Sequence, residues 1–99
     1  LSIKQIFFDA ISSGEKNVEY RELKPTRMSL YTEVDKSTGK RYIRRYDALR
    51  LSAGYNKDRD ILLVEVKDTV YKKEENMIEY HLGKILEYNI KKRNDGNHD

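Results

Sequence analysis

The sequence contains no cysteine, and it has a single proline in 99 residues. Without cysteine the protein has no disulfide, no thiolate metal site and no cysteine nucleophile. No apolar run approaches the roughly 20 residues of a membrane-spanning helix, and the first residues do not resemble a secretory signal. These absences favour a cytoplasmic protein without a membrane partner.

Apolar residues are also scarce: they make up 37% of the chain, the same share as charged residues. A chain of this length forms one domain around one core. We expect that domain to span residues 1–93 and a disordered tail to follow at residues 94–99. Eight tyrosines are expected to supply much of the core, and their polar tips also suit a binding cleft.

The formal net charge of +3 favours polyanionic partners, although many small domains carry as much. The sequence has no glycine-rich phosphate loop, nucleophile elbow or histidine-zinc motif. The two histidines, His81 and His98, lie far apart, and Asp58 and Asp60 lack the glycine and distal glutamate of a calcium loop. We therefore expect neither a metal nor a cofactor.

Hydrophobic periodicity predicts a short strand at residues 1–5 and then one helix. Apolar side chains recur at helical spacing from Ile6 to Ile11. Gly14 follows as the expected left-handed C-cap of that helix.

Directly after this helix the period changes to two. Residues 17–23 alternate in the manner of a strand, with Val18 and Tyr20 on one face and Glu19 and Arg21 on the other. We expect the face of Val18 and Tyr20 to meet the core, because these are the less polar side chains.

Further strands are predicted at residues 46–53, 61–67, 76–82 and 84–91, the last two of which could form one bent strand. The segment 61–67 is apolar on both faces, which suits a central position. Residues 26–45 are expected to hold a short helix, a turn and a hairpin or loop. Together these elements predict an α+β, mainly β domain: a small closed or half-closed barrel of five to six strands with one or two short helices.

The segment Ser13-Gly14-Glu15-Lys16, followed by Val18-Glu19-Tyr20-Arg21, resembles the signature of the ASCH (activating signal cointegrator homology) domain, a branch of the PUA-like superfamily. Residues 61–66 resemble the central strand of that family, and residues 81–86 resemble its closing strand. The similarity spans residues 2–90. It implies a PUA-like barrel with a cleft beside the turn from Gly14 to Lys16, and it implies RNA or a nucleotide as the partner.

Some members of the family are small enzymes, which cleave RNA or remove the acetyl group from N4-acetylcytidine. The lysine of the amidohydrolase group aligns with Lys16, but the threonine three residues later is replaced here by Glu19. If this chain is an enzyme, the resemblance implies that Lys16 and Glu19 are its catalytic residues. The replaced threonine disfavours that activity.

The candidate site residues each have a second, structural interpretation. Lys16 could contact phosphate, or lose its proton if desolvated, or be a solvated turn residue. Glu19 and Arg21 could present a carboxylate and a guanidinium to a base or a phosphate. Alternatively they form an exposed ion pair worth about 0–1 kcal/mol.

Two further groups are candidates for ligand contacts. Tyr55 and Asn56, in the loop after Gly54, could stack on a base and read its edge, or simply form a turn. A basic cluster interleaved with Tyr42 and Tyr46 has the composition expected at a single-stranded nucleic-acid surface, or of an ordinary charged surface. Its members are Arg41, Arg44, Arg45 and Arg50.

Three functions follow as hypotheses. The first is a module that binds RNA or a nucleotide through Gly14, Lys16, Glu19, Arg21, Arg50, Tyr55 and Asn56. The second is a small hydrolase acting on a modified nucleoside or on RNA, and the third is a regulatory adaptor that binds other proteins. The sequence does not indicate the oligomeric state.

Overall fold

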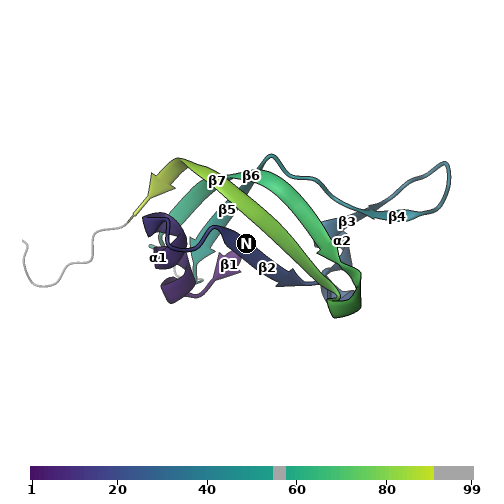
Figure 1. Ribbon diagram of the computed structural model, residues 1–99, viewed down its shortest axis with the longest axis horizontal. Coiled ribbons are helices and arrows are strands. Elements are labelled where there is room, and N and C mark those ends of the chain that lie inside the picture. The colour runs from purple at the N-terminus through teal and green to yellow at the C-terminus, as the bar shows by residue number, and fades with distance from the viewer. Residues whose placement is uncertain (55–57, 91–99) are drawn as a thin grey trace, which may run out of the picture.

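The computed structural model describes residues 1–54 and 58–90, and it shows an α+β domain that is mainly β (Figure 1). The predicted tail at residues 94–99 lies outside this range. In chain order the elements are β1 (Ser2–Ile3), α1 (Gln5–Ser13), β2 (Val18–Glu22), the 3-10 helix η1 (Pro25–Arg27), α2 (Met28–Tyr31), β3 (Thr32–Val34), β4 (Arg41–Ile43), β5 (Ala48–Ala53), β6 (Ile61–Lys72), the 3-10 helix η2 (Lys73–Glu75) and β7 (Met77–Asn89). No helix in the described ranges is long and apolar enough to cross a membrane.

Five strands form one mixed sheet in the order β1-β5-β6-β7-β2. The pair β1–β5 is parallel and the other pairs are antiparallel. The central position predicted for residues 61–67 is confirmed, since β6 lies in the middle of the sheet. β3 and β4 form a separate two-stranded hairpin, which is the hairpin alternative for the segment before residue 46.

The two strands predicted on either side of Gly83 are one long strand, β7, which pairs with β6 through several register shifts. Next to Gly83, the Glu65 side chain crosses from β6 and accepts a hydrogen bond of 3.1 Å from the Lys84 N–H. A Cβ at position 83 would lie 2.1 Å from Glu65 Oε1. Glycine therefore leaves room here for the Glu65 carboxylate, which a larger residue would displace.

Helix α1 forms where the apolar spacing predicts it, but Ile6 and Phe7 of that apolar set are exposed. Phe8 and Ile11, three positions apart, are both buried against the sheet. Gly14 ends the helix with φ 87°, and its N–H donates to the Ile11 carbonyl at 3.1 Å. The expected left-handed cap is confirmed.

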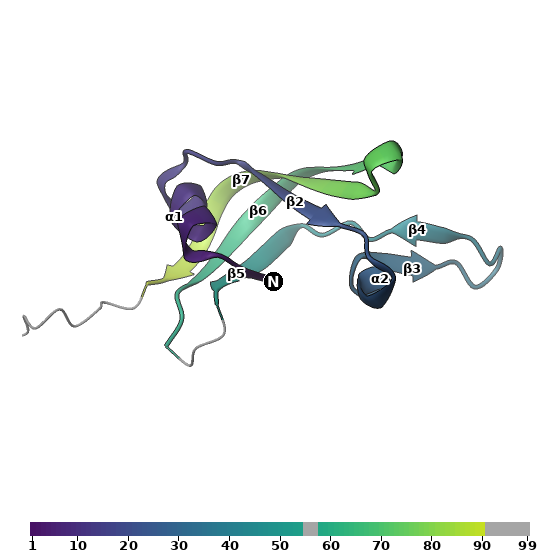
Figure 2. The ribbon, with the colours of Figure 1, turned by 90° about the horizontal axis from the view of Figure 1, so that it is seen from below.

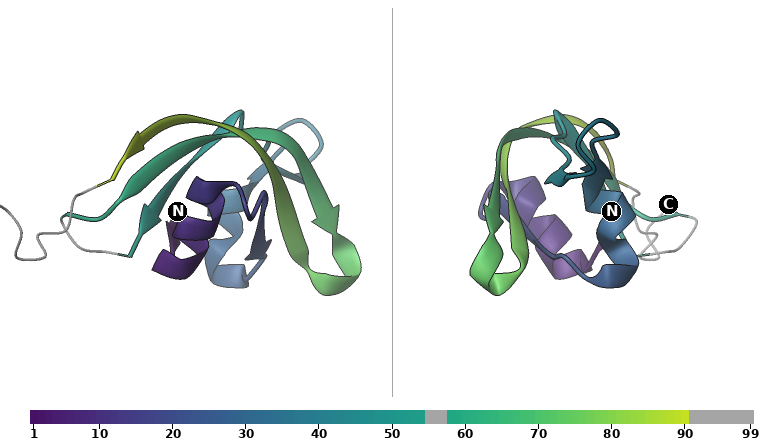
Figure 3. Two further views of the ribbon diagram at one scale, coloured as in Figure 1. Left: turned by 60° about the vertical axis from the view of Figure 1, so that its left-hand side comes forward. Right: turned by 90° about the vertical axis from the view of Figure 1, so that its right-hand side faces the viewer.

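The sheet arches over α1, and the core lies on its concave side (Figures 2 and 3). Leu51, Leu62, Ile78 and Tyr80 are among the residues fully buried there. Tyr31 also belongs to the core, whereas Tyr20, Tyr42, Tyr71 and Tyr88 are exposed. Tyrosine thus supplies less of the core than its abundance predicts.

The core side predicted for β2 is wrong. Glu19 is only 5% exposed, whereas Tyr20 is 54% exposed. In the β2–β7 ladder Glu19 lies opposite Tyr80 and Arg21 lies opposite Ile78, both of which are fully buried. The charged face of β2 therefore meets the core, which is possible because neighbouring cations offset the cost of burying the carboxylate.

The two edge strands of the sheet, β1 and β2, lie near one another because the sheet is curled (Figure 1). Within the described ranges no backbone ladder joins them. The sheet is therefore open along this seam, and each strand presents one unpaired backbone edge to it.

Candidate functional site

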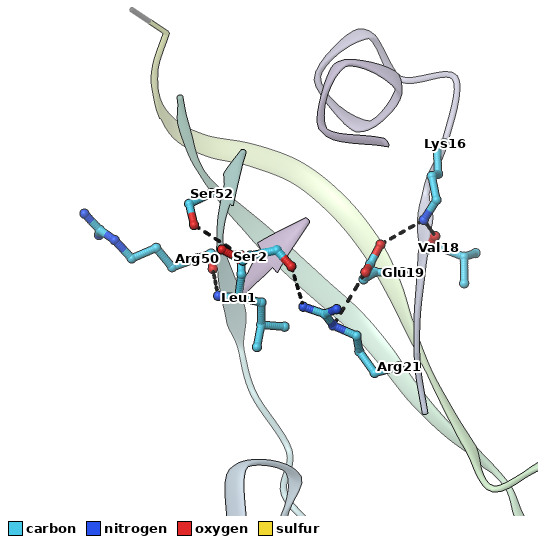
Figure 4. Close-up of polar contacts among 8 residues, drawn as sticks. All are labelled: Leu1, Ser2, Lys16, Val18, Glu19, Arg21, Arg50 and Ser52. Atoms are coloured by element: carbon cyan, nitrogen blue, oxygen red, sulfur yellow. Dashed lines mark hydrogen bonds and ion pairs between the residues drawn. The ribbon is translucent and has the colours of Figure 1, made fainter. Parts of the chain in front are cut away.

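A chain of charged side chains follows the inner face of β2 (Figure 4). The turn that ends α1 places Lys16 beside the strand, and the Lys16 N–H donates to the Ala10 carbonyl at 3.0 Å. Lys16 Nζ donates to Glu19 Oε1 at 2.9 Å and also to the Val18 carbonyl. The Lys16 ammonium is thus held against the strand by two acceptors.

Glu19 also faces a second cation. Arg21 Nε lies 3.6 Å from Glu19 Oε2, and Arg21 Nη2 donates to the Ser2 carbonyl at 3.1 Å. Nε itself is buried and has no hydrogen-bond acceptor within the described ranges. Lys16, Glu19 and Arg21, called here the ion-pair chain, therefore hold one another in place on β2.

One end of this chain lies at a cleft of about 600 Å³ between β1 and the segment that runs from β2 to α2. Three cations, Arg21, Lys24 and Arg27, line this cleft, and Glu22 is the carboxylate among its lining residues. Tyr20 and Tyr31 line it as well. It is called the seam cleft below.

A smaller hollow of about 260 Å³ lies beside the turn from Gly14 to Lys16, where the ASCH resemblance implies a cleft. Its walls include Gly14 and Lys16, the neighbouring serines at the end of α1, and Gly83 of β7. The ion-pair chain thus has one end at each hollow: Lys16 lines the smaller one and Arg21 lines the seam cleft. Glu19 is buried between these two residues.

Arg50 lies apart from the ion-pair chain. It is exposed on the outer face of β5, while Leu49 and Leu51 point into the core. Its side chain extends away from Arg21 and Glu19 (Figure 4). Tyr55 and Asn56, the remaining candidates, lie outside the residues that the structure describes.

The arginines of the predicted basic cluster make separate contacts at and near the β3–β4 hairpin. Arg41 Nη1 donates to Thr32 Oγ1 at 2.8 Å. Arg44 pairs with Glu33 and donates through Nε to the Thr32 carbonyl at 3.1 Å. Arg41 and Arg44 therefore tie β4 to β3, a structural role that the composition of the cluster does not distinguish from ligand binding.

Sequence reasoning missed Lys24, Arg27 and Tyr31 as candidates. A signal for the two cations was present, because Arg21, Lys24 and Arg27 recur at every third position around Pro25. Their grouping at one cleft depends on the reversal of the chain at η1 (Pro25–Arg27). Periodicity over seven residues does not reveal that reversal.

Tyr80 lies on β7 directly opposite Glu19. The side chain is fully buried, and its hydroxyl has no hydrogen-bond partner within the described ranges. Burial raises the pKa of Tyr80 well above its usual value, and the nearby rings of Tyr46 and Tyr31 act in the same direction. A neutral phenol is therefore strongly favoured in the folded protein.

No group of three or more histidine, aspartate or glutamate side chains in residues 1–54 and 58–90 is placed to hold a metal ion. His81 Nε2 lies 3.1 Å from Glu79 Oε1 on β7, a pair of neighbours on one strand. Comparisons of the chain with protein-family models, with curated proteins and with solved structures found no match.

Proposed function

We propose that this chain is an ASCH-type, PUA-like domain that binds single-stranded RNA or a nucleotide in the seam cleft. The observation that carries the proposal is the composition of that cleft, where three cations face one carboxylate beside two tyrosines. Cations beside aromatic rings suit a ligand that has both phosphates and bases. The volume of the cleft, about 600 Å³, lies within the range of about 300 to 1,000 Å³ that is usual for small-molecule sites.

The geometry of Arg21 supports the proposal further. Its guanidinium is already oriented by the Ser2 carbonyl and lies beside Glu19. A cation fixed before binding loses less side-chain entropy when a phosphate arrives. Arginine also presents a planar fork of donors that matches phosphate oxygens.

The PUA-like part of the proposal is supported by the curvature of the sheet. Its edge strands, β1 and β2, approach one another at the seam, as they must in a half-open barrel. The adaptor hypothesis predicts no ligand-sized cleft, so the presence of one favours ligand binding.

The test is fluorescence anisotropy with a short labelled single-stranded RNA at two salt concentrations. Single strands lose affinity with a slope of about −0.7 per neutralised phosphate in a plot of log affinity against log salt. The three cations of the cleft therefore predict a negative slope of magnitude no greater than about 2, and Arg27→Gln should reduce that magnitude. Lys36→Gln, which removes an exposed charge from the turn between β3 and β4, is the matched control. Absence of RNA binding at both salt concentrations, together with absence of nucleotide binding, would refute the proposal.

A second candidate function is hydrolysis of a modified nucleoside or of RNA. One observation favours it: Lys16, which lines the smaller hollow, lies 2.9 Å from the Glu19 carboxylate, so the two residues that the ASCH resemblance implies as catalytic are in contact. The assay is product formation from N4-acetylcytidine and from RNA oligomers by the wild type and by Lys16→Ala. Equal turnover by both proteins would remove this candidate.

A further inference from the structure

The seam cleft is small for a nucleic-acid groove. Protein sites that track single strands cover about 4 to 16 nucleotides on a comparable small barrel. The seam cleft holds about 600 Å³, the volume of a site for one drug-sized molecule. Such a hollow accommodates one nucleotide rather than a run of them.

Two parts of the chain form the walls of the cleft. One continuous stretch, from Tyr20 in the middle of β2 to Tyr31 at the end of α2, supplies most of them, and residues 1–2 with Ser52 of β5 supply the rest. Because Leu23 is buried and the chain reverses at η1, Lys24 and Arg27 follow Arg21 around one hollow. The three cations are therefore gathered on one side of the ligand volume.

These cations differ in how firmly they are held. The Arg21 side chain is 21% exposed and contacts Glu19 and the Ser2 carbonyl. Lys24 and Arg27 are exposed and have no hydrogen bond or ion pair from their side chains to the described residues. Arg21 thus offers a guanidinium of fixed orientation, while the side chains of Lys24 and Arg27 are free to adjust. This arrangement suits a compact, highly charged group on the ligand.

A terminal phosphate is such a group. A phosphate monoester carries about −1.5 to −2 charges at neutral pH and has three strong acceptor oxygens. A phosphodiester inside a strand carries only one charge. Three cations opposed by the Glu22 carboxylate therefore match a monoester better than one internal phosphodiester.

We infer that the ligand of the seam cleft is a single nucleotide that bears a terminal phosphate, either a free nucleoside monophosphate or the phosphorylated end of an RNA strand. This inference rests on the proposed function and specifies its ligand. Arg21, Lys24 and Arg27 hold the phosphate, and Tyr20, the exposed tyrosine of the cleft, meets the base. Glu19 is a positioning residue, because it acts on the ligand only through the orientation of Arg21.

The first experiment is calorimetric titration of the wild-type protein with adenosine, adenosine monophosphate and inorganic phosphate, followed by the corresponding uridine compounds. We expect each monophosphate to bind at least tenfold more tightly than its nucleoside and more tightly than inorganic phosphate. Equal affinity for nucleoside and monophosphate would overturn the inference. Equal affinity for inorganic phosphate and monophosphate would overturn it too, because the base would then make no contact.

The second experiment separates the two sources of the phosphate. Five-nucleotide RNAs with a 5′-phosphate, with a 3′-phosphate or with both ends unphosphorylated are compared in the same titration. A preference for one phosphorylated end identifies an RNA terminus as the ligand, and a preference for the free monophosphate over all three RNAs identifies the mononucleotide. If the unphosphorylated RNA binds as tightly as the best phosphorylated ligand, the inference fails while the proposed function stands. If no RNA and no nucleotide binds, both fail.

Two variants test the assigned residues. Arg27→Gln should reduce the preference for a monophosphate over its nucleoside by at least fivefold, whereas the matched surface change Lys36→Gln should leave that preference unaltered. Glu19→Gln should also reduce the preference, without a comparable change in nucleoside affinity, since the Arg21 guanidinium would lose the carboxylate that orients it. Circular dichroism establishes that each variant is folded. If Arg27→Gln and Lys36→Gln have equal effects, the cations of the cleft do not hold the phosphate.

Discussion

The Arg21 guanidinium on β2 donates a hydrogen bond of 3.1 Å to the Ser2 carbonyl on β1. These strands lie at the two ends of the sheet order, so one side chain links the edges that no described backbone ladder joins. A hydrogen bond from a charged donor contributes about 1.5–3 kcal/mol to stability. Arg21 therefore has two roles: it bridges the seam, and it lines the cleft that lies there.

Arg21→Met should destabilise the protein by about 2–3 kcal/mol. The change keeps an unbranched apolar stem but removes both the bond to Ser2 and the charge beside Glu19. Urea unfolding followed by circular dichroism measures the effect. Arg45→Met, which removes a guanidinium whose side chain is 77% exposed, should change the free energy of unfolding by less than about 0.5 kcal/mol. Equal losses in both variants would show that the seam contact contributes nothing specific.

Lys16 and Glu19 should be energetically coupled. Each single variant, Lys16→Met and Glu19→Gln, breaks the same partly buried contact, so the losses in the double variant should be less than additive. Residues in direct contact have coupling energies of about 0.5–3 kcal/mol. A double-mutant cycle from urea unfolding measures this coupling. Additive losses would mean that the 2.9 Å contact between Nζ and Oε1 does not stabilise the fold.

Tyr80→Phe should be neutral or slightly stabilising at pH 7. The hydroxyl that it removes is buried without a hydrogen-bond partner in the described ranges, and such a group stabilises the fold little. The measurement is urea unfolding of both proteins at neutral pH. A loss above about 2 kcal/mol would indicate that the hydroxyl makes a stabilising bond.

The same pair of proteins should diverge in alkali. The pKa of Tyr80 in the folded state is raised above the ordinary value of 10.0, chiefly by burial. As pH rises past that ordinary value, the unfolded chain releases the phenol proton while the folded protein retains it. Stability contributed by the neutral phenol is therefore complete below pH 10 and falls above it. Wild type should lose more stability than Tyr80→Phe between pH 9 and pH 11, and parallel losses would contradict the assignment.

Gly83→Ala should cost about 1–2 kcal/mol. Its new methyl group would lie 2.1 Å from Glu65 Oε1, so the Glu65 side chain must move and release the Lys84 N–H. Because the nearest clash is with that carboxylate, the same change should cost less in a Glu65→Ala background. Thermal unfolding of the two single variants and the double variant measures this difference. An undiminished cost would place the strain elsewhere, first at the Lys67 side chain, whose Cγ and Cδ would lie 2.9 Å from the new methyl group.

Several elements could be predicted from local sequence. The helical spacing from Ile6 to Ile11 and the cap at Gly14 act within one stretch of chain, so periodicity was sufficient to identify α1. The apolar run from Ile61 likewise indicated the central strand β6. Only Leu62 and Val64 of this run are buried, whereas Ile61 and Leu63 on the other face are half-buried.

The orientation of β2 could not be predicted in this way. Alternation separates Val18 and Tyr20 from Glu19 and Arg21, but it does not state which set is buried. The usual preference for burying the less polar set fails here because the inner set has its own counter-charges, with Glu19 between Lys16 and Arg21. Whether these charges neutralise one another depends on the geometry of their side chains. Alternation along a strand carries no information about that geometry.

By itself, the sequence determined the cysteine-free chemistry, the first helix with its glycine cap, the central strand and the presence of a lysine, a glutamate and an arginine on and beside one strand. Only the tertiary structure decided that the charged face of β2 is the buried one and that Lys24 and Arg27 join Arg21 around a hollow. The physical reason is the separation along the chain of the residues that interact. Helix spacing and strand alternation arise from neighbouring residues, whereas the seam exists because the curvature of the whole sheet brings its first and last strands together.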